Sequence, residues 1–272
     1  MKTIKSVACG VLCLWLVACS SGAPPVNTLE QALNGDHRSA ANKARDTARH
    51  PVETLTFLQV EPQHTVVEIW PGGKGWYTEV LAPYLRNDGK LYAAHFHPEA
   101  AVPYLRKSLQ VFAEKLATNP SAYGKVETTI LQPGLLIDMA PSGSVDRVLT
   151  FRNVHNWMKM GYAQEIFDAS FVALKPGGLL GVIEHRAKVG TSMDDMIRSG
   201  YVTEAQVKVY AVAAGFEFVA ASEVNANPDD IKEYPSGVWS LPPTLRMGDE
   251  NKAYYESIGE SDRMTLMFKK PE

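Results

Sequence analysis

From residue 64 onward, short apolar runs alternate with amphipathic stretches, and this pattern predicts strands that alternate with helices. The apolar runs predict strands at 66–69, 90–97, 125–131, 145–151, 179–184, 216–224 and 263–268. The amphipathic stretches predict helices at 78–85, 102–116, 162–174 and 203–214. Alternating strands and helices form a mostly parallel sheet that is covered on both faces. The pattern therefore predicts an α/β fold with a seven-stranded sheet.

Two segments depart from this alternation. Residues 28–57 are predicted to be helical, with interruptions near Gly35 and at Pro51. Residues 225–261 are rich in Pro, Asp, Gly and aromatic residues and predict a long excursion before the last strand, a kind of segment that is often functional. The predicted organisation after the N-terminus is a helical segment at 28–58 and one α/β domain at 59–272, which contains the excursion.

The N-terminus has the features of a secretory signal. Lys2 and Lys5 precede a short apolar stretch at 7–18, which is followed by Cys19. The sequence Leu-Val-Ala-Cys at 16–19 resembles the lipobox of bacterial lipoproteins. A plain signal peptide cut nearby and an uncleaved anchor are the alternatives.

The lipobox resemblance has consequences for localisation. It implies that residues 1–18 are removed, that Cys19 carries the lipid and that 19–27 form a tether. Ser20 follows the cysteine, which in that family implies the outer membrane. We therefore expect an exported, periplasmic protein that meets the membrane only through its lipid anchor.

Composition and charge exclude several classes of function. The chain has 272 residues and a net charge of −3, which does not provide the broad basic face that nucleic-acid binding needs. No internal apolar run reaches the length of a membrane span, so a polytopic membrane protein is excluded. The three cysteines all lie in the first 19 residues, so the body has no disulfide scaffold.

A glycine-rich turn after the first strand carries the clearest chemical signal. Glu68 ends the strand, and Gly72, Gly73 and Gly75 follow before the next helix. In open α/β sheets, ligands bind beyond the carboxyl ends of the strands. Glycines let the backbone approach a ligand, and a carboxylate can bind a hydroxyl or an amino group. Many nucleotide-binding folds share this pattern.

Further motifs narrow the family. Gly-Ser-Val-Asp-Arg-Val-Leu-Thr-Phe at 143–151 and Leu-Lys-Pro-Gly-Gly-Leu-Leu at 174–180, together with the glycine turn, resemble class I S-adenosylmethionine-dependent methyltransferases. The resemblance covers roughly residues 60–270 and implies a Rossmann-like class I methyltransferase fold. Phe-Arg-Asn-Val-His-Asn-Trp at 151–157 and Glu-Ser-Asp-Arg-Met-Thr-Leu at 260–266 are similar to a bacterial group of methyltransferases of unassigned substrate.

The resemblance implies S-adenosylmethionine as cofactor and a set of residues that bind it. These residues are Glu68, Gly72, Gly73 and Gly75, with His97 near the ribose and Asp138 near the adenine edge. The chain departs from the pattern in three places. Trp70 stands where the first glycine is usual, Lys74 lengthens the turn, and the second strand ends without an acid.

A second group of residues is expected to face the substrate. The ends of parallel strands share one edge, so we expect His155, Arg152, Tyr77, Glu184 and His185 to converge there. His155 is the candidate general base, because the pKa of imidazole lies near neutral pH. The alternative is that His155 only holds the turn after the fourth strand. Tyr234, Trp239 and Arg246 of the excursion are expected to cover the same edge.

Other chemistries have weaker signatures. His95, His97, His155 and His185 all fall at strand ends, but no His-Glu-x-x-His motif or cysteine cluster accompanies them, so no metal is expected. The chain also lacks a Gly-x-Ser-x-Gly elbow and a Walker phosphate loop.

Basic residues in the first helical segment have two interpretations. Arg38, Lys43, Arg45 and Arg49 form either a solvated helix face or a basic lid near a ligand that carries a carboxylate.

The sequence thus predicts methyl transfer from S-adenosylmethionine to a small-molecule acceptor, by an exported, lipid-anchored enzyme. The competing hypothesis is a non-catalytic periplasmic protein that binds a small molecule with a degenerate methyltransferase fold.

Overall fold

The structure, a computed structural model, describes residues 26–272. The predicted signal peptide at 1–18, the lipidation site Cys19 and most of the tether lie outside the described residues. Within the described part of the chain, no helix combines the length and the apolar character that a membrane span requires.

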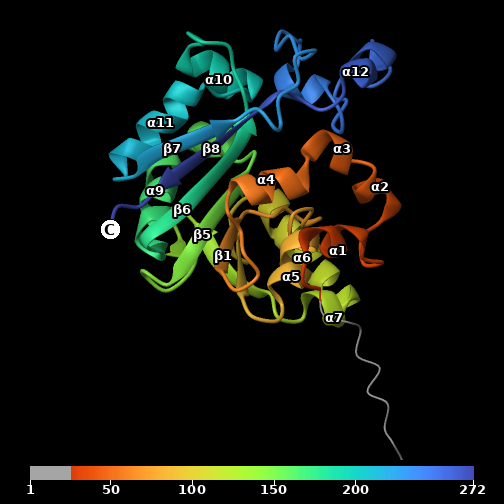
Figure 1. Ribbon diagram of the computed structural model, residues 1–272. Helices are drawn as coiled ribbons and strands as arrows, with labels where there is room; N and C mark the ends of the chain where they lie inside the picture. Colours follow the sequence, from red (N-terminus) through yellow and green to blue (C-terminus); the bar gives the residue numbers. More distant parts are fainter. Residues whose placement is uncertain (1–25) are drawn as a thin grey trace, which may run out of the picture.

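One sheet organises the molecule (Figure 1). Its strands are β1 (Thr65–Ile69), β2 (Lys90–His95), β3 (Glu127–Gln132), β4 (Leu136–Asp138), β5 (Val145–Phe151), β6 (Leu174–His185), β7 (Glu217–Ser222) and β8 (Arg263–Lys269). They lie in the order β4-β3-β2-β1-β5-β6-β8-β7, in which β4 and β8 pair antiparallel to their neighbours. The mostly parallel α/β fold is confirmed, with the short edge strand β4 in addition to the seven predicted strands.

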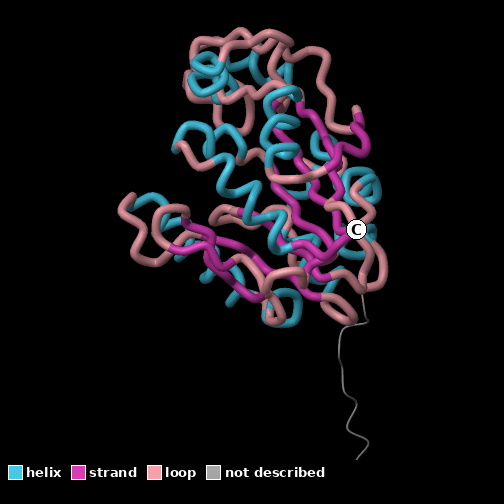
Figure 2. Tube along the Cα trace, turned by 90° about the vertical axis from the view of Figure 1, so that its left-hand side faces the viewer, coloured by secondary structure: helices cyan, strands magenta, loops and turns pink. Residues whose placement is uncertain are grey.

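Helices cover both faces of this sheet, as Figure 2 shows in a view turned by 90°. The helices are α1 (Leu29–Asn34), α2 (Ala40–Lys43), α3 (Asp46–Arg49), α4 (Pro51–Phe57), α5 (Thr78–Leu85), α6 (Pro103–Thr118), α7 (Pro120–Tyr123), α8 (Val154–Met160), α9 (Ala163–Ala173), α10 (Met193–Ser199), α11 (Glu204–Ala213) and α12 (Lys252–Ile258). A short 3₁₀ helix, η1, spans Gly237–Ser240.

Alternation along the central strands builds two cores, one on each face. Val67 and Val148 pack in a core with α8, α9 and α11, whereas their neighbours Val66 and Leu149 pack in a core with α4 and α5. Successive side chains of a strand point to opposite faces, so a strand that is buried on both sides reads as a continuous apolar run. This explains why the strands were recognisable in the sequence.

The N-terminal segment is helical and interrupted, and it packs on the second core through Leu29 and Leu55. The breaks fall at the predicted positions. Helix α1 ends at Asn34, and His50 adopts a left-handed conformation (φ 40°) immediately before Pro51 begins α4. Proline suits the first position of a helix because its missing N–H would have no partner there.

The strand order defines where a ligand is expected. Strand β1 pairs with β2 on one side and with β5 on the other, so the chain changes direction across the sheet between β1 and β5. The segments that follow β1 and β5 diverge at this point and leave a crevice, which is the usual ligand position in open α/β sheets.

Candidate functional site

Two cavities meet above the crevice between β1 and β5. The aromatic cavity has a volume of about 490 Å³ and is lined by Trp70, Phe96, Tyr104 and Trp239, among others. The arginine cavity has a volume of about 270 Å³, and its lining includes Arg152 and Arg263. Five residues line both cavities: Trp70, Gly72, Asn153, His155 and Trp239.

His155 stands at this junction and is held by Glu184. It lies in the first turn of α8, and its Nδ1 is 3.0 Å from Oε1 of the fully buried Glu184. The backbone N–H groups of His155 and His185 donate to the same carboxylate at 3.2 and 2.8 Å. Because an ionised carboxylate only accepts hydrogen bonds, Nδ1 of His155 carries the proton, and Nε2 is the nitrogen left to accept one.

His185 completes the histidine pair. Its ring lies 5.4 Å from that of His155, and its Nδ1 lies 2.5 Å from the hydroxyl oxygen of Ser261. Burial, followed by the charges of His155, Arg152 and other neighbours, holds the pKa of His185 well below its ordinary value. His185 is therefore neutral at physiological pH.

Tyr77 lies away from the other predicted substrate residues. It is buried in the second core, where its ring stacks on Phe151 at 3.5 Å and its hydroxyl donates to the carbonyl of Arg49 at 3.3 Å. The residues that line the two cavities do not include it. The structure thus brings His155, Arg152 and His185 together in the lining of the arginine cavity. Glu184 contacts His155 but does not line the cavity, and Tyr77 packs against Phe151 in the second core.

Of the glycines in the turn after β1, only Gly72 faces open space. It has a positive φ of 69°, and a Cβ added there would meet no atom within 4 Å. A Cβ on Gly73 would meet Val111 at 3.1 Å, and one on Gly75 would meet Phe112 at 2.9 Å. Gly73 and Gly75 therefore allow the turn to pack closely against α6, whereas Gly72 leaves the backbone open to both cavities.

Glu68 is closed off from the cavities. It is buried beneath the start of α5, where the Thr78 hydroxyl donates to its Oε2 at 2.6 Å. Burial raises the pKa of Glu68 to about 7. The side chain cannot reach a ligand in this structure, and its visible role is to connect β1 to α5.

Trp70 occupies the space between the ends of β1, β2 and β3. It adopts a left-handed conformation (φ 45°), which is uncommon for a bulky residue. Its indole N–H donates to the carbonyl of Leu131 at 2.8 Å, and its ring lies 4.7 Å from Phe96 and 6.0 Å from Trp157. A glycine at this position would leave that space open.

The end of β2 presents His95 rather than His97. His95 is the last residue of the strand and is fully buried, and burial lowers its pKa to about 4. His97 lies beyond the strand and accepts a hydrogen bond from the N–H of Glu99 at 3.0 Å. Asp138 lies on the exposed edge strand β4. Neither His97 nor Asp138 lines the aromatic cavity.

Arginines from the two ends of the chain gather behind the arginine cavity. Arg45 and Arg49 of the N-terminal segment contact Glu260 through their Nε atoms at 2.6 and 3.2 Å. Arg263, the first residue of β8, pairs with the same carboxylate. Glu260 and Arg263 belong to the motif at 260–266 but were not predicted as site residues. The contacts of Glu260 with Arg45 and Arg49 join segments more than 200 residues apart, which no local pattern reveals.

The first helical segment is not a solvated basic face. Arg38 and Arg49 are both buried, with exposed fractions of 4% and 3%. Arg38 forms a bidentate pair with Asp46 at 2.7 Å, and Lys43 donates to the carbonyl of Asn34. The solvated-face interpretation is therefore wrong for these two arginines.

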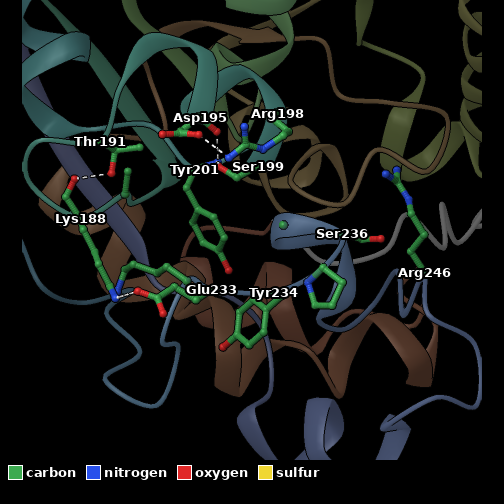
Figure 3. A pocket seen from close by; sticks show the side chains of 14 residues that line it. Lys188, Thr191, Asp195, Arg198, Ser199, Tyr201, Glu233, Tyr234, Ser236 and Arg246 are labelled. Atoms are coloured by element: carbon green, nitrogen blue, oxygen red, sulfur yellow. Dashed lines mark hydrogen bonds and ion pairs between the residues drawn. The ribbon is translucent and has the colours of Figure 1, made fainter.

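The excursion forms a wall of both cavities. Trp239 lines both of them, and Pro242, Pro243 and Thr244 line the arginine cavity. Tyr234 and Arg246 instead line a third cavity of about 570 Å³ on the other side of the excursion (Figure 3). Only Trp239 of the three expected residues covers the site.

Three potential metal ligands also come together. Ligand atoms of His155, Glu184 and His185 lie within 4.8 Å of one another. The neighbouring charges of Arg152 and Arg263 oppose a cation at this place, as the lowered pKa of His185 indicates. The arrangement fits a histidine held by a carboxylate better than it fits a metal centre.

Comparison with known proteins identifies the fold. No protein-family model and no curated protein matches the chain. Among solved structures, an S-adenosylmethionine-dependent methyltransferase from Aquifex aeolicus is similar over 84% of this chain and 93% of its own, with 14% identity and a TM-score of 0.54. The cyclase SpnF is similar over 88% and 86%, also with 14% identity, and a TM-score of 0.57. The chain has the class I methyltransferase fold.

The methyltransferase SibL has the same fold, with a TM-score of 0.51 and 15% identity over 84% of this chain and 56% of its own. In this methyltransferase fold, the aromatic cavity lies beside the turn after β1. Its lining includes the open Gly72, the buried Phe96, and Asn153, whose amide nitrogen donates to the Ile69 carbonyl and the Thr150 hydroxyl. Among the residues that the structure describes, no carboxylate lines either cavity, so a ribose would be held there without one.

Proposed function

We propose that the protein transfers a methyl group from S-adenosylmethionine to a small-molecule acceptor. The observation that carries the proposal is the junction of the two cavities at His155. A transferase must hold two molecules side by side, and these cavities share a wall of five residues at the ligand position of the sheet. The fold of the similar structures supports the same conclusion.

The aromatic cavity is the proposed cofactor site. Gly72, Phe96 and Asn153 would hold S-adenosylmethionine, which when bound supplies a methyl group activated by a positively charged sulfur. The chain's own contribution is to place the acceptor next to that methyl group and to exclude water from both. Trp239 of the excursion lines both cavities, and there it would help to exclude water once both molecules are bound.

His155 is the proposed general base. Its Nδ1–H is held by Glu184, so Nε2 is free to take a proton from an acceptor hydroxyl, amine or carboxyl group. The buried carboxylate also stabilises the imidazolium that results. His185, which is neutral, is proposed to line the acceptor site without moving a proton.

The experiment that tests this proposal is calorimetric titration of the full chain with S-adenosylhomocysteine. Gly72→Leu would project a side chain from the open backbone of Gly72, and we expect at least a tenfold loss of affinity. Gly143→Leu is the matched control, because Gly143 also has a positive φ and open space but precedes β5 at the opposite edge of the sheet. Equal binding by all three proteins, or no binding by the wild type, contradicts the proposal.

One observation favours a second candidate function. Trp70 fills the space between the ends of β1, β2 and β3, and the surrounding arginines oppose a sulfonium cation. These features suit a protein that binds a small molecule in the arginine cavity and does not use S-adenosylmethionine. A wild-type chain that fails to bind the cofactor but binds an anion would support this candidate.

We also propose that the protein is exported and anchored by a lipid on Cys19. The support is the charged start, the short apolar stretch and the Leu-Val-Ala-Cys sequence. The methyl acceptor would then be a molecule of the periplasm.

A further inference from the structure

Four arginines surround one carboxylate beside the arginine cavity. Glu260 pairs with Arg45, Arg49 and Arg263, and Arg152 adds a fourth guanidinium. Although burial opposes ionisation of Glu260, Arg263, Arg49 and Arg45 hold its pKa well below the usual range. The four arginines carry four positive charges, and Glu260 and the nearby Glu184 provide two carboxylates. This group therefore has an excess of positive charge in a buried place.

Arg152 has no partner in this group. Within residues 26–272, its side chain forms neither an ion pair nor a hydrogen bond, whereas each of the other three arginines reaches Glu260. It lines the arginine cavity from a left-handed backbone conformation (φ 63°), directly after β5. Desolvation, followed by repulsion from Arg263, lowers the pKa of Arg152 to about 10. Arg152 is half-buried, so this unpaired guanidinium is only partly hydrated, and a bound anion would stabilise it.

The neighbouring arginines also have unused donors. Arg45 Nη2, Arg49 Nη1 and Arg263 Nε are buried and have no hydrogen-bond partner. Arg49 and Arg263 are both 3% exposed, so water from the bulk does not reach these atoms freely. Buried donors without acceptors are rare in native proteins. Of these three arginines only Arg263 lines the arginine cavity, so Arg263 is the one whose unused donor bears on that cavity.

The third cavity provides a contrast. Figure 3 shows Lys188 paired with Glu233 and Arg198 paired with Asp195 at that cavity, so carboxylates already neutralise two of the cations that line it. The arginine cavity instead combines Arg152 and Arg263 with His155, His185 and Thr244, and no carboxylate lines it. The absence of carboxylates from its lining distinguishes it from the larger cavity.

We propose that the arginine cavity binds the acidic group of a small anionic molecule, a carboxylate or a phosphate ester, with Arg152 as its principal contact. A planar guanidinium binds both groups through two hydrogen bonds. The volume of about 270 Å³ corresponds to roughly nine water molecules at 30 Å³ each, which suits a small metabolite. Binding of an anion in this cavity does not depend on the proposed function. Only the identification of that anion as the methyl acceptor rests on it. Bound there, the anion would lie beside the Nε2 atom of His155.

The test is anion binding to the full chain without any cofactor. Inorganic phosphate and citrate are the two probes, with sodium chloride at matched ionic strength and glycerol as the uncharged control. We expect saturable binding of at least one probe and a higher melting temperature in its presence. A response to phosphate indicates a phosphate ester as the natural ligand, and a response to citrate indicates a carboxylate.

Arg152→Gln separates a binding role from a structural one. We expect the affinity for the anion to fall about tenfold or more, while the melting temperature without anion is unchanged or higher because a repulsive charge is removed. Arg86→Gln is the control, because Arg86 lies at the end of α5 and donates to the Pro120 carbonyl, away from both cavities.

The inference would be overturned if neither probe bound better than chloride, or if the wild type and Arg152→Gln bound the anion equally well. It would also be overturned if Arg152→Gln lost much stability and Arg152→Lys restored the stability without restoring anion binding. Because the measurement needs no cofactor, it remains informative if S-adenosylhomocysteine does not bind. Cofactor binding without an anion response would overturn this inference and leave the proposed function intact.

Discussion

Glu184 determines the geometry of the site at the scale of single residues. Its carboxylate accepts from the His155 ring and from two backbone N–H groups, while its exposed fraction is zero. Charge-assisted hydrogen bonds of this kind stabilise a buried anion and hold their donors in fixed directions. The orientation of His155 therefore depends on β6, which carries Glu184, as much as on α8.

The first prediction concerns His155. In His155→Asn, the amide nitrogen takes the position of Nδ1 and can still donate to Glu184, but the side chain cannot act as a base near neutral pH. We expect an unchanged melting temperature and a drop in turnover of about 100-fold or more. The measurement is S-adenosylhomocysteine release in the presence of a mixture of small carboxylic acids and phosphate esters, with His64→Gln at the opposite edge of the sheet as the control. A melting temperature that falls sharply with unchanged turnover would show that His155 is structural.

The second prediction concerns Glu68 and pH. Burial raises its pKa to about 7, from an ordinary value of 4.5. Between these two values the folded chain binds more protons at Glu68 than the unfolded chain does, so the contribution of Glu68 to stability falls as the pH rises from about 4.5 to about 7. The loss is about 3 to 4 kcal/mol at most, at roughly 1.4 kcal/mol for each pKa unit.

Glu68→Gln removes this titration and keeps an acceptor for Thr78. We expect the variant to lose less stability than the wild type over that pH range and to be the more stable protein at pH 8. Denaturant unfolding at a series of pH values measures both quantities. Parallel stability curves for the two proteins would show that Glu68 is not the group responsible.

The sequence indicated His155, Arg152 and His185 because one rule, that strand ends share an edge, was enough to bring them together. It marked Glu260 and Arg263 only as part of a family motif and not as site residues, since the contacts of Glu260 with Arg45 and Arg49 join segments more than 200 residues apart. Contacts at such separations follow from how α3 and the approach to β8 pack. No local pattern of residues carries that information.

At the scale of elements, the turn after β1 combines two roles. Gly73 and Gly75 let it pack against α6, while Trp70 turns back over the ends of β2 and β3. The sequence patterns missed the short helices α7, α8, α10 and α12; α8 is only seven residues long, too short for its buried side chains to form a clear periodic pattern. The long strand β6 likewise begins at Leu174, before the Pro-Gly-Gly segment that suggested only the end of a helix.

The third prediction tests the role of this turn. Trp70→Gly should open the space between β1, β2 and β3 and raise the affinity for S-adenosylhomocysteine by about tenfold. It should also cost roughly 2–4 kcal/mol of stability, because the loss of a buried indole outweighs the relief of a left-handed backbone. Calorimetry and denaturant unfolding measure the two effects. Trp76→Ala is the control, because Trp76 is equally buried in the same turn but contacts Arg38 and Arg49. An affinity that does not change would show that Trp70 does not limit cofactor binding.

At the scale of the whole molecule, the two ends of the described chain close over the same edge of the sheet. The N-terminal helices contribute Arg45 and Arg49, the approach to β8 contributes Glu260, and the excursion contributes Trp239 (Figure 1). The sheet and its switch in strand order were predictable, because both faces of each central strand are buried. The packing of the N-terminal helices and the excursion over this edge was not predictable, because it depends on loops whose sequences have no repeating pattern.

The fourth prediction concerns the anchor. We expect the mature chain to begin at Cys19 and to carry an acyl mass, and Cys19→Ser to move the protein from the membrane fraction to the soluble fraction. Mass spectrometry of the membrane-extracted N-terminal peptide measures the modification. An unmodified N-terminus at another residue would contradict the lipoprotein interpretation.

The central claim is that two molecules meet at His155, one in each cavity. A crystal structure of the full chain with S-adenosylhomocysteine tests it most directly. We predict that the ligand lies in the aromatic cavity over Gly72, with its sulfur facing the arginine cavity and His155. The claim would be contradicted by a ligand bound anywhere else on the chain, or by both cavities remaining free of it at a saturating concentration.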